Sequence, residues 1–193
     1  MKLPREFYLR DGLTVARELI GKKLVTNLSD GLTSGVIVET EAYMGAIDAA
    51  AHSYRGLTER TRIFFGDGGF VYVYLIYGRN LCTNVVANVA GVPEAVLIRA
   101  LEPVDGVELM KLRRGKNNLR DLCSGPGKLS QALGVTKNFY GADLCGDEIF
   151  IEPAENFQAT VTATRRINVD YAGAAAEYPW RFIAAGNKFL STK

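Results

Sequence analysis

Three strongly β-prone segments follow one another between residues 70 and 101, and they restrict the fold more than any other part of the chain. Phe70–Tyr77 is rich in aromatic and β-branched residues, Cys82–Val89 follows a short connection, and Glu94–Leu101 begins after the turn Gly91-Val92-Pro93. Such short connections join antiparallel strands, because parallel strands need a crossover of a dozen or more residues. We therefore expect an antiparallel sheet and no doubly wound topology.

Weaker patterns add further elements around that sheet. Strands are expected at Lys23–Leu28, Gly35–Glu41, Ile149–Ile151, Gln158–Thr164 and Arg181–Ala185. Helices are expected between an N-cap at Asp11 and Gly21, and over Pro103–Arg113 and Pro126–Leu133. The segment Met44–Gly69 has weak periodicity and is expected to be a long loop with short helical turns. The sequence predicts an α+β fold in one domain over residues 1–193: a curved, mainly antiparallel, open barrel-like β-sheet surrounded by short helices and long loops.

Composition excludes several classes of protein. With 193 residues, of which 48% are hydrophobic, the chain can bury a core, and no apolar run approaches the ~20 residues that span a bilayer. The N-terminus is too charged for a secretory signal. The three cysteines (Cys82, Cys123, Cys145) form no CxxC pair, and there is one histidine. We expect no metal, no cofactor, no membrane association, a monomer, and a reducing cytoplasmic setting, nucleoid-associated if bacterial.

Two glutamates lie at the end of the strand expected at Gly35–Glu41. Glu39 and Glu41 have the same parity as Ile37, so all three side chains leave one face if the strand persists. A carboxylate on a buried strand is costly unless it is paired or used in chemistry. On spacing alone, the simpler interpretation is an exposed strand end with solvated glutamates.

The aromatic and imidazole side chains that follow have structural and functional interpretations. His52 is either a hydrogen-bonded structural group or an imidazole that contacts a phosphate or flanks a bound ring. Tyr72 and Tyr74 share a strand face, which is common in a core, whereas Tyr77 has the opposite parity and precedes Gly78 at a turn. One aromatic in a pocket and another at a protruding tip is what extraction of a base from a duplex requires.

A basic segment follows the sheet. Between residues 111 and 128 there are six basic residues and one acid, although the whole chain carries only +2. This segment is either a solvated helix end and loop or a patch that attracts phosphate. It contains CSGPGKL, in which glycines and Pro126 open a helix and Lys128 adds a charge; the spacing is not that of a P-loop. Together these features favour contact with a phosphate backbone.

Taken together, the motifs resemble the alkyladenine (3-methyladenine) DNA glycosylase family, which also removes hypoxanthine and etheno-adenine. The matching strings run in order along nearly the whole chain: LPREFYLRDGLTVARELIGKKLV, VETEAYMG, AHS, YVYLIYG, AVLIRALEP, CSGPGKLSQALG and YPWRF. The resemblance implies a monofunctional enzyme that acts on double-stranded DNA containing damaged purines. A carboxylate that activates water and aromatic faces that hold a base suit hydrolysis of a base–sugar bond.

The resemblance also implies roles for individual residues. Glu41 corresponds to the general base, and Arg99 to an arginine near the catalytic water and the DNA backbone. Tyr43 and His52 correspond to one wall of the base pocket and Tyr74 to the opposite wall. Asn84 corresponds to a filter against the guanine amine, and Tyr77 to a wedge inserted through the minor groove. Ser124, Gly125 and Lys128 correspond to phosphate contacts.

The chain departs from the family pattern in four places. Thr61 replaces the Asn of an Arg-Asn pair, Phe64 replaces a Met, Arg79 follows the wedge turn where a Met is common, and Asn168 replaces a Gly. These departures leave the implied catalytic residues intact, and we expect them to affect substrate range and the DNA-facing rim.

Two other functions remain open. A non-catalytic module that flips damaged bases without cutting would need the same pocket. A carbohydrate glycosidase with Glu39 and Glu41 as its carboxyl pair is a weaker alternative, because residues two apart on one strand face cannot easily bracket a glycosidic bond.

Overall fold

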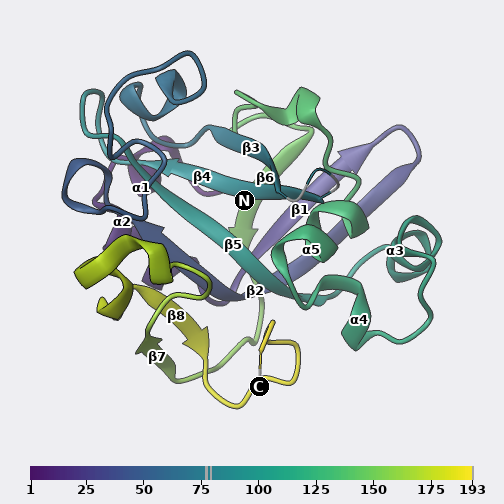
Figure 1. Cartoon of the computed structure of the whole chain (residues 1–193). Helices are drawn as coiled ribbons and strands as arrows, with labels where there is room; N and C mark the ends of the chain where they lie inside the picture. Colours follow the sequence, from purple (N-terminus) through teal and green to yellow (C-terminus); the bar gives the residue numbers. More distant parts are fainter. Residues whose placement is uncertain (77, 79, 193) are drawn as a thin grey trace.

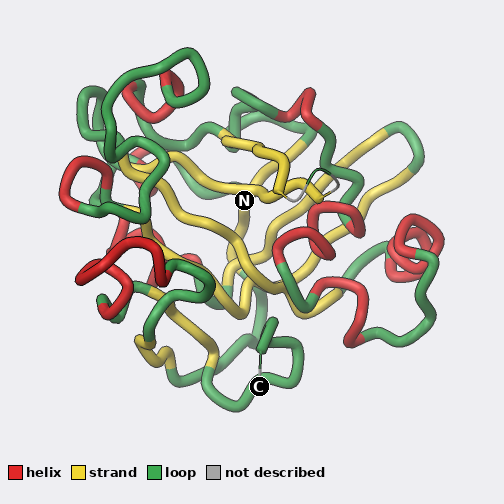
Figure 2. Tube along the Cα trace, in the orientation of Figure 1, coloured by secondary structure: helices red, strands yellow, loops and turns green. Residues whose placement is uncertain are grey.

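An open antiparallel sheet organises the chain (Figures 1 and 2). The computed structural model describes residues 1–76, 78 and 80–192, and within these residues the sheet has eight strands in the order β3-β4-β5-β2-β1-β6, with β8 paired to β2 and β7 to β8. The strands are β1 (Lys22–Leu28), β2 (Gly31–Tyr43), β3 (Val71–Ile76), β4 (Asn80–Ala87), β5 (Glu94–Pro103), β6 (Ile149–Pro153), β7 (Val161–Thr164) and β8 (Arg181–Ala184). The expected α+β class and open, mainly antiparallel sheet are confirmed.

Short helices surround the sheet. They are α1 (Arg5–Tyr8), α2 (Gly12–Leu19), α3 (Val107–Arg114), α4 (Arg120–Cys123) and α5 (Pro126–Ala132), with 3-10 turns η1 (Gly45–Ile47), η2 (Arg62–Phe65), η3 (Lys137–Phe139) and η4 (Asp170–Glu177). In Figure 1, α3, α4 and α5 gather beside one end of the sheet. Among the described residues, no helix has the length and apolar character needed to cross a membrane.

Helix α2 fixes the position of the central strand. The predicted N-cap is confirmed, because the Asp11 carboxylate accepts a hydrogen bond from the Thr14 N–H at 3.0 Å. The helix packs across β2, and the Thr40 hydroxyl donates to the Ala16 carbonyl at 2.8 Å. Since alternate residues of a strand point to opposite faces, Glu39 and Glu41 point away from α2.

Strand β2 is the central element of the sheet. Its first half pairs with β1, residues 39–41 pair with β8, and its other edge pairs with β5 along most of its length. The register with β5 shifts between Ile37 and Thr40, around Glu39. Such irregularities increase local twist and re-aim side chains, and they are common next to active sites.

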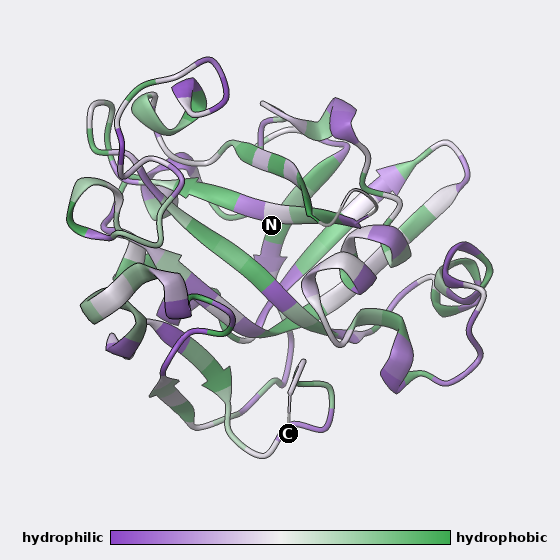
Figure 3. Ribbon diagram, viewed as in Figure 1, coloured by the Kyte–Doolittle hydropathy of each residue, from purple (hydrophilic) through white to green (hydrophobic). Residues whose placement is uncertain are grey.

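One row of directly paired residues crosses five strands. Tyr72 pairs with Asn84, Asn84 with Leu97, Leu97 with Glu41, and Glu41 with Arg181. Directly opposite residues project from the same face of a sheet. The register therefore brings an aromatic ring, an amide, a carboxylate and a guanidinium to a single face. Figure 3 shows hydrophobic colouring along these central strands and hydrophilic colouring mostly on the outer loops.

The structure corrects two element boundaries. Pro103 ends β5 and is not the start of a helix, because Val104 and Asp105 continue to hydrogen-bond with Ser34 on β2. Helix α3 begins only after Gly106, which has a φ of +68°. The strand expected from Gln158 begins at Val161.

Candidate active site

A pair of carboxylates shares one arginine in the interior of the protein. Glu39 and Glu41 have no exposed surface, and the Arg99 side chain is 9% exposed. Arg99 donates from Nε to Glu39 Oε1 at 3.1 Å and from Nη1 to Glu41 Oε2 at 3.3 Å. The shared face predicted for the two glutamates is confirmed, and the interpretation of an exposed strand end with solvated glutamates is wrong.

Glu39 accepts four hydrogen bonds from three residues. Its Oε1 accepts from Arg99, from Arg181 Nε at 2.7 Å and from the Ser191 hydroxyl at 2.8 Å, and its Oε2 accepts from the Ser191 N–H at 2.7 Å. Of these three residues, only Arg99 lines the cavity of about 400 Å³ beside the carboxylate pair. Glu39 thus connects β2, β5, β8 and the C-terminal segment.

Glu41 differs from Glu39 in the position of its partners. Oε1 accepts from the Ile167 N–H at 2.7 Å, and Oε2 accepts from the Tyr43 hydroxyl at 2.9 Å and from Arg99. Tyr43, Arg99 and Ile167 all line the cavity of about 400 Å³, so the Glu41 carboxylate lies directly behind the cavity wall. Its own hydrogen-bond partners thus stand between this carboxylate and the cavity.

All four residues predicted for the base pocket line one cavity. Tyr43, His52, Tyr74 and Asn84 surround a space of about 50 Å³, and the first three also line the larger cavity that contains Arg99. The Asn84 amide nitrogen donates to the Tyr72 carbonyl at 3.1 Å, which holds this side chain in a fixed position. Residues far apart in sequence are therefore assembled beside the buried carboxylates.

The aromatic walls touch each other in this structure. The rings of His52 and Tyr74 meet edge to face, with centroids 4.6 Å apart and planes inclined by 76°. A base sandwiched between two rings needs two van der Waals spacings of about 3.5 Å each. The two side chains are brought together as predicted, but the space between them must widen before a base can enter.

Arg60 joins this aromatic group, and the sequence analysis missed it. Its Nε donates to the Tyr72 hydroxyl at 2.9 Å, and its guanidinium lies over the Tyr74 ring at 5.6 Å. The Tyr72 hydroxyl is in turn 3.0 Å from His52 Nδ1. The only local signal was the position of Arg60 in the loop where the chain departs from the family pattern.

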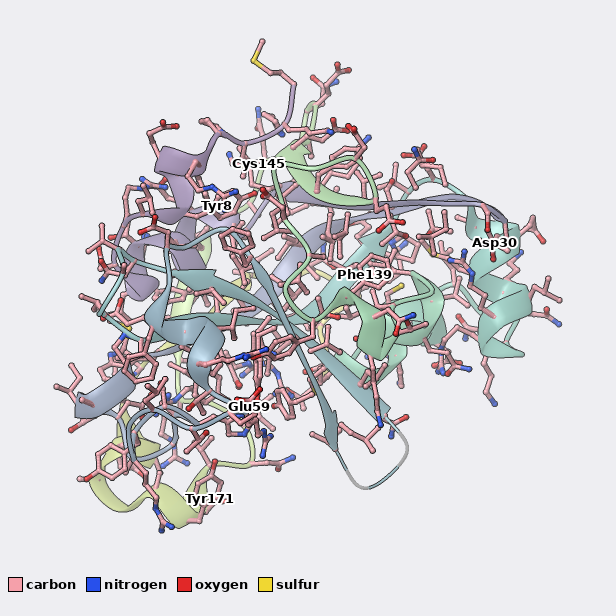
Figure 4. The ribbon with its side chains drawn as sticks, turned by 90° about the horizontal axis from the view of Figure 1, so that it is seen from above. Tyr8, Asp30, Glu59, Phe139, Cys145 and Tyr171 are labelled. Atoms are coloured by element: carbon pink, nitrogen blue, oxygen red, sulfur yellow. The ribbon has the colours of Figure 1, made fainter. Side chains whose placement is uncertain are left out.

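Tyr171 is a second residue without a sequence signal. It lies in η4, borders both cavities and is 73% exposed. In Figure 4, Tyr171 and Glu59 lie on one side of the molecule, whereas Tyr8 and Cys145 lie on the other. The aromatic cavity therefore has an exposed tyrosine at its rim.

A buried ion pair between Arg166 and Asp48 packs against the Tyr43 ring. Arg166 donates to both carboxylate oxygens of Asp48, at 2.5 and 2.8 Å, and neither side chain has exposed surface. The Arg166 guanidinium also lies 4.8 Å from the Tyr43 ring and 5.1 Å from the Trp180 ring. Burial raises the pKa of Tyr43 well above its usual value, and Glu41 raises it further. The Tyr43 hydroxyl consequently stays protonated and donates to Glu41.

The predicted phosphate-binding segment adjoins the carboxylates. Ser124 forms a β-bridge with Ala100, the residue after Arg99, and Pro126 lines the larger cavity. Gly125 adopts φ +149° and ψ 150°, a conformation largely restricted to glycine. Lys128 Nζ donates to the Ser124 hydroxyl at 3.3 Å. Ser124, Gly125 and Lys128 thus form one connected group at the cavity edge.

Much of the neighbouring basic segment is engaged within the protein. Arg113 pairs with Asp30 at 2.7 Å, Lys111 pairs with Glu108 at 2.7 Å, and Arg114 donates to the Gln131 side chain. Arg120 Nε donates to the Lys188 carbonyl at 2.8 Å. These contacts support helix packing, so less of the segment's charge is available to a phosphate than composition indicated.

Three of the four departures from the family pattern fall on described residues, and the structure shows the surroundings of each. Asn168 has a φ of +58°, a conformation that Asn tolerates better than most residues other than Gly, and it lines the larger cavity. Phe64 is buried and lies 4.5 Å from the Tyr72 ring centroid. Thr61 is buried and hydrogen-bonds with Thr58. The proposed wedge Tyr77 and the departure at Arg79 lie outside the described residues.

Comparisons with known proteins identify the family of this chain. The family model described as Methylpurine-DNA glycosylase (MPG) matches residues 6–188. Proteins named "Putative 3-methyladenine DNA glycosylase" are similar over their full length: the chain is 49% identical to one from Alkaliphilus oremlandii over 202 residues, covering 100% of both chains. One from Clostridium acetobutylicum is 46% identical over 200 residues, covering 99% of this chain and 98% of the relative. The chain therefore belongs to the methylpurine-DNA glycosylase family and is a DNA-repair hydrolase of N-glycosyl bonds.

Proposed function

We propose that this protein removes 3-methyladenine and related damaged purines from double-stranded DNA by flipping the nucleotide into the aromatic cavity and hydrolysing the base–sugar bond. The observation that carries the proposal is the difference between the two buried glutamates. All three partners of Glu41 line the larger cavity, whereas Arg99 alone among the partners of Glu39 does so. Glu41 is therefore the carboxylate that can accept a proton from water.

The proposed reaction uses one water molecule as its nucleophile. Glu41 takes a proton as the water oxygen bonds to C1′, and the electron pair of the C1′–N bond leaves with the base. The negative charge beside C1′ also stabilises the oxocarbenium-like sugar as this bond lengthens. Neither cavity has a lysine among its described lining residues, which supports water attack over Schiff-base chemistry.

The geometry favours this function over a carbohydrate glycosidase. A retaining or an inverting glycosidase places its two carboxyl groups on either side of the scissile bond. Here Glu39 and Glu41 bind the same Arg99 side chain, so they lie on one side of any bond in the cavity. All proposed site residues come from one chain, so we propose that it acts as a monomer.

The aromatic cavity is proposed to select the damaged base. Rings of Tyr43, His52 and Tyr74 offer stacking worth about 1–3 kcal/mol per base with little dependence on base identity. We expect release of hypoxanthine, etheno-adenine and 7-methylguanine in addition to 3-methyladenine. This is measured as free base from duplexes that each carry one lesion; release of 3-methyladenine alone would contradict the broad range.

The fixed Asn84 amide is the proposed filter against guanine. Replacing Asn84 with Ser removes the group held against the Tyr72 carbonyl and enlarges the cavity. In the same duplex panel, the ratio of guanine to hypoxanthine release should rise. An unchanged ratio would rule out the filter.

Lys128 and Ser124 are proposed to hold a DNA phosphate. We expect Lys128→Ala to weaken binding to damaged and undamaged duplex by similar factors and to reduce the salt dependence of binding by about one phosphate contact. Fluorescence anisotropy over a series of salt concentrations measures both effects. Arg113→Ala is a poor comparison because it breaks the Asp30 pair. The control is Arg17→Ala, on an exposed residue of α2, the helix that packs on the face of β2 opposite to Glu41. A loss confined to lesion-containing DNA would contradict a phosphate role.

A further inference from the structure

We propose that Arg60 is a positioning residue which acts through the Tyr72 hydroxyl to keep the His52 imidazole neutral, with its proton on Nε2. Arg60 lies outside the expected set of pocket residues, and any effect of it on base release rests on the proposed function.

The directions of the hydrogen bonds follow from the chemistry of the three groups. Arginine can only donate, so Arg60 Nε donates to the Tyr72 oxygen at 2.9 Å. The Tyr72 hydroxyl proton is then free for His52 Nδ1, which is 3.0 Å away. Arg60 Nη2 also lies 3.4 Å from Nδ1. Since both neighbours donate, Nδ1 must present its lone pair.

An accepting Nδ1 determines the tautomer of the ring. In a neutral imidazole one nitrogen carries the proton and the other accepts, so the proton lies on Nε2. The reverse tautomer would place an N–H against the Arg60 and Tyr72 donors. An imidazolium would do the same and would add a positive charge beside the guanidinium.

Among the described contacts of His52 there is no carboxylate that would favour protonation of the imidazole. Tyr72 and Tyr74 of β3 pack against the ring, Arg60 faces it from the loop before η2, and Tyr43 and Tyr171 share its cavity. The pKa of His52 is lowered to about 4, first because of the packing around the ring and second because of Arg60. His52 therefore remains neutral at pH 7, although the residue reaches the protein surface.

A fixed neutral tautomer has a direct consequence for binding. Nε2–H becomes a donor of constant orientation, suited to an acceptor atom of a flipped purine or to a phosphate oxygen. The uncharged ring also keeps its face available for stacking on a base. Without Arg60, the imidazole can exchange tautomers and protonate at a higher pH.

The single histidine of the chain makes this inference testable without a substrate. Long-range ¹H–¹⁵N NMR spectra of the imidazole, recorded from pH 4 to 8, report its tautomer and its pKa. We expect the wild-type protein to show the Nε2–H tautomer with no protonation near neutral pH. In Arg60→Gln, the pKa should move upward toward the ordinary value of about 6.5, and the tautomer should become mixed.

Two further variants separate the effect of Arg60 from that of a neighbouring arginine and from that of the Tyr72 hydroxyl. Arg62→Gln is the matched control, because within the described part of the chain its side chain pairs only with the exposed Glu59, at 3.1 Å. The spectra of this variant should match the wild type. Tyr72→Phe removes the connecting hydroxyl while keeping Arg60, and it should give a mixed tautomer. Arg60→Gln spectra identical to the wild type, or a wild-type pKa near 6.5, would overturn the inference.

The pH profile of base release extends the test to function. If Arg60 positions His52 for the reaction, kcat/KM should decrease as the pH is lowered and His52 becomes protonated. This decrease should begin at a higher pH in Arg60→Gln than in the wild type or in Arg62→Gln. An unshifted profile would contradict the functional part. Absence of base release by the wild-type protein would contradict the proposed function and leave the NMR result to decide the positioning.

Discussion

Arg166→Met is expected to lower the free energy of unfolding by about 3–5 kcal/mol, because it leaves the Asp48 carboxylate buried without its cation. Both side chains lack exposed surface, and Arg166 also donates to the Ala42 and Ala175 carbonyls at 3.0 Å each. Among the described residues, Asp48 then retains only the N–H groups of Met44 and Ala50 as donors. Urea denaturation followed by circular dichroism measures the loss.

The neighbouring arginine provides a matched control. Arg165 pairs with Glu177 through one Nη at 2.6 and 2.7 Å, but both side chains are about two-thirds exposed. Exposed pairs contribute little, so Arg165→Met should stay within about 1 kcal/mol of the wild type. The double variant Asp48→Asn/Arg166→Met should lose less than the sum of its single variants. Equal stability of the Arg165 and Arg166 variants would contradict the structural role of the buried pair.

The sheet was predictable because its signals are local. β-Prone runs, short connections and the Gly91-Val92-Pro93 turn indicate antiparallel pairing without knowledge of distant contacts, and strand parity correctly placed Glu39 and Glu41 on one face. The helix boundary at Pro103 was wrong because Val104 and Asp105 continue the pairing of β5 through hydrogen bonds to Ser34, which lies at least 70 residues earlier in the chain. Tertiary pairing of this kind overrides local helix signals.

The site was predictable only in part. Strand parity could place Glu39 and Glu41, but it could not show that Ser191 and Arg181 bind Glu39, because these contacts span more than 140 residues. The Arg166–Asp48 pair spans 118 residues and joins two irregular segments that carry no periodic pattern. Composition also overestimated the basic charge of residues 111–128 that is available to DNA, because contacts with distant residues, such as that between Arg113 and Asp30, are not visible in a local sequence pattern.

Glu41→Gln is expected to reduce base release by on the order of 10²–10⁴-fold, because it removes the proton acceptor while conserving the shape of the side chain. The neutral amide also faces Arg99, Tyr43 and the Ile167 N–H, all of which donate to Glu41. Binding of lesion DNA should persist, since stacking and phosphate contacts do not involve this carboxylate.

Glu39→Gln is the matched control on the same strand and the same arginine. Its amide would oppose donors from Arg99, Arg181 and Ser191, so we expect a loss of stability of about 1–3 kcal/mol. Release should fall much less than in Glu41→Gln, because Arg181 and Ser191, which hold Glu39, do not line the cavity proposed to hold the water.

The central claim is tested most directly by single-turnover release of free 3-methyladenine from alkylated duplex DNA, compared for wild type, Glu41→Gln and Glu39→Gln at saturating protein. We expect the wild type to release the base and to leave an abasic site in an intact strand. Glu41→Gln should bind the same DNA but release the base at least about 100-fold more slowly. The release rate of Glu39→Gln should lie closer to that of the wild type. Release by Glu41→Gln at the wild-type rate, or tight binding by the wild type with no release over hours, would contradict the central claim.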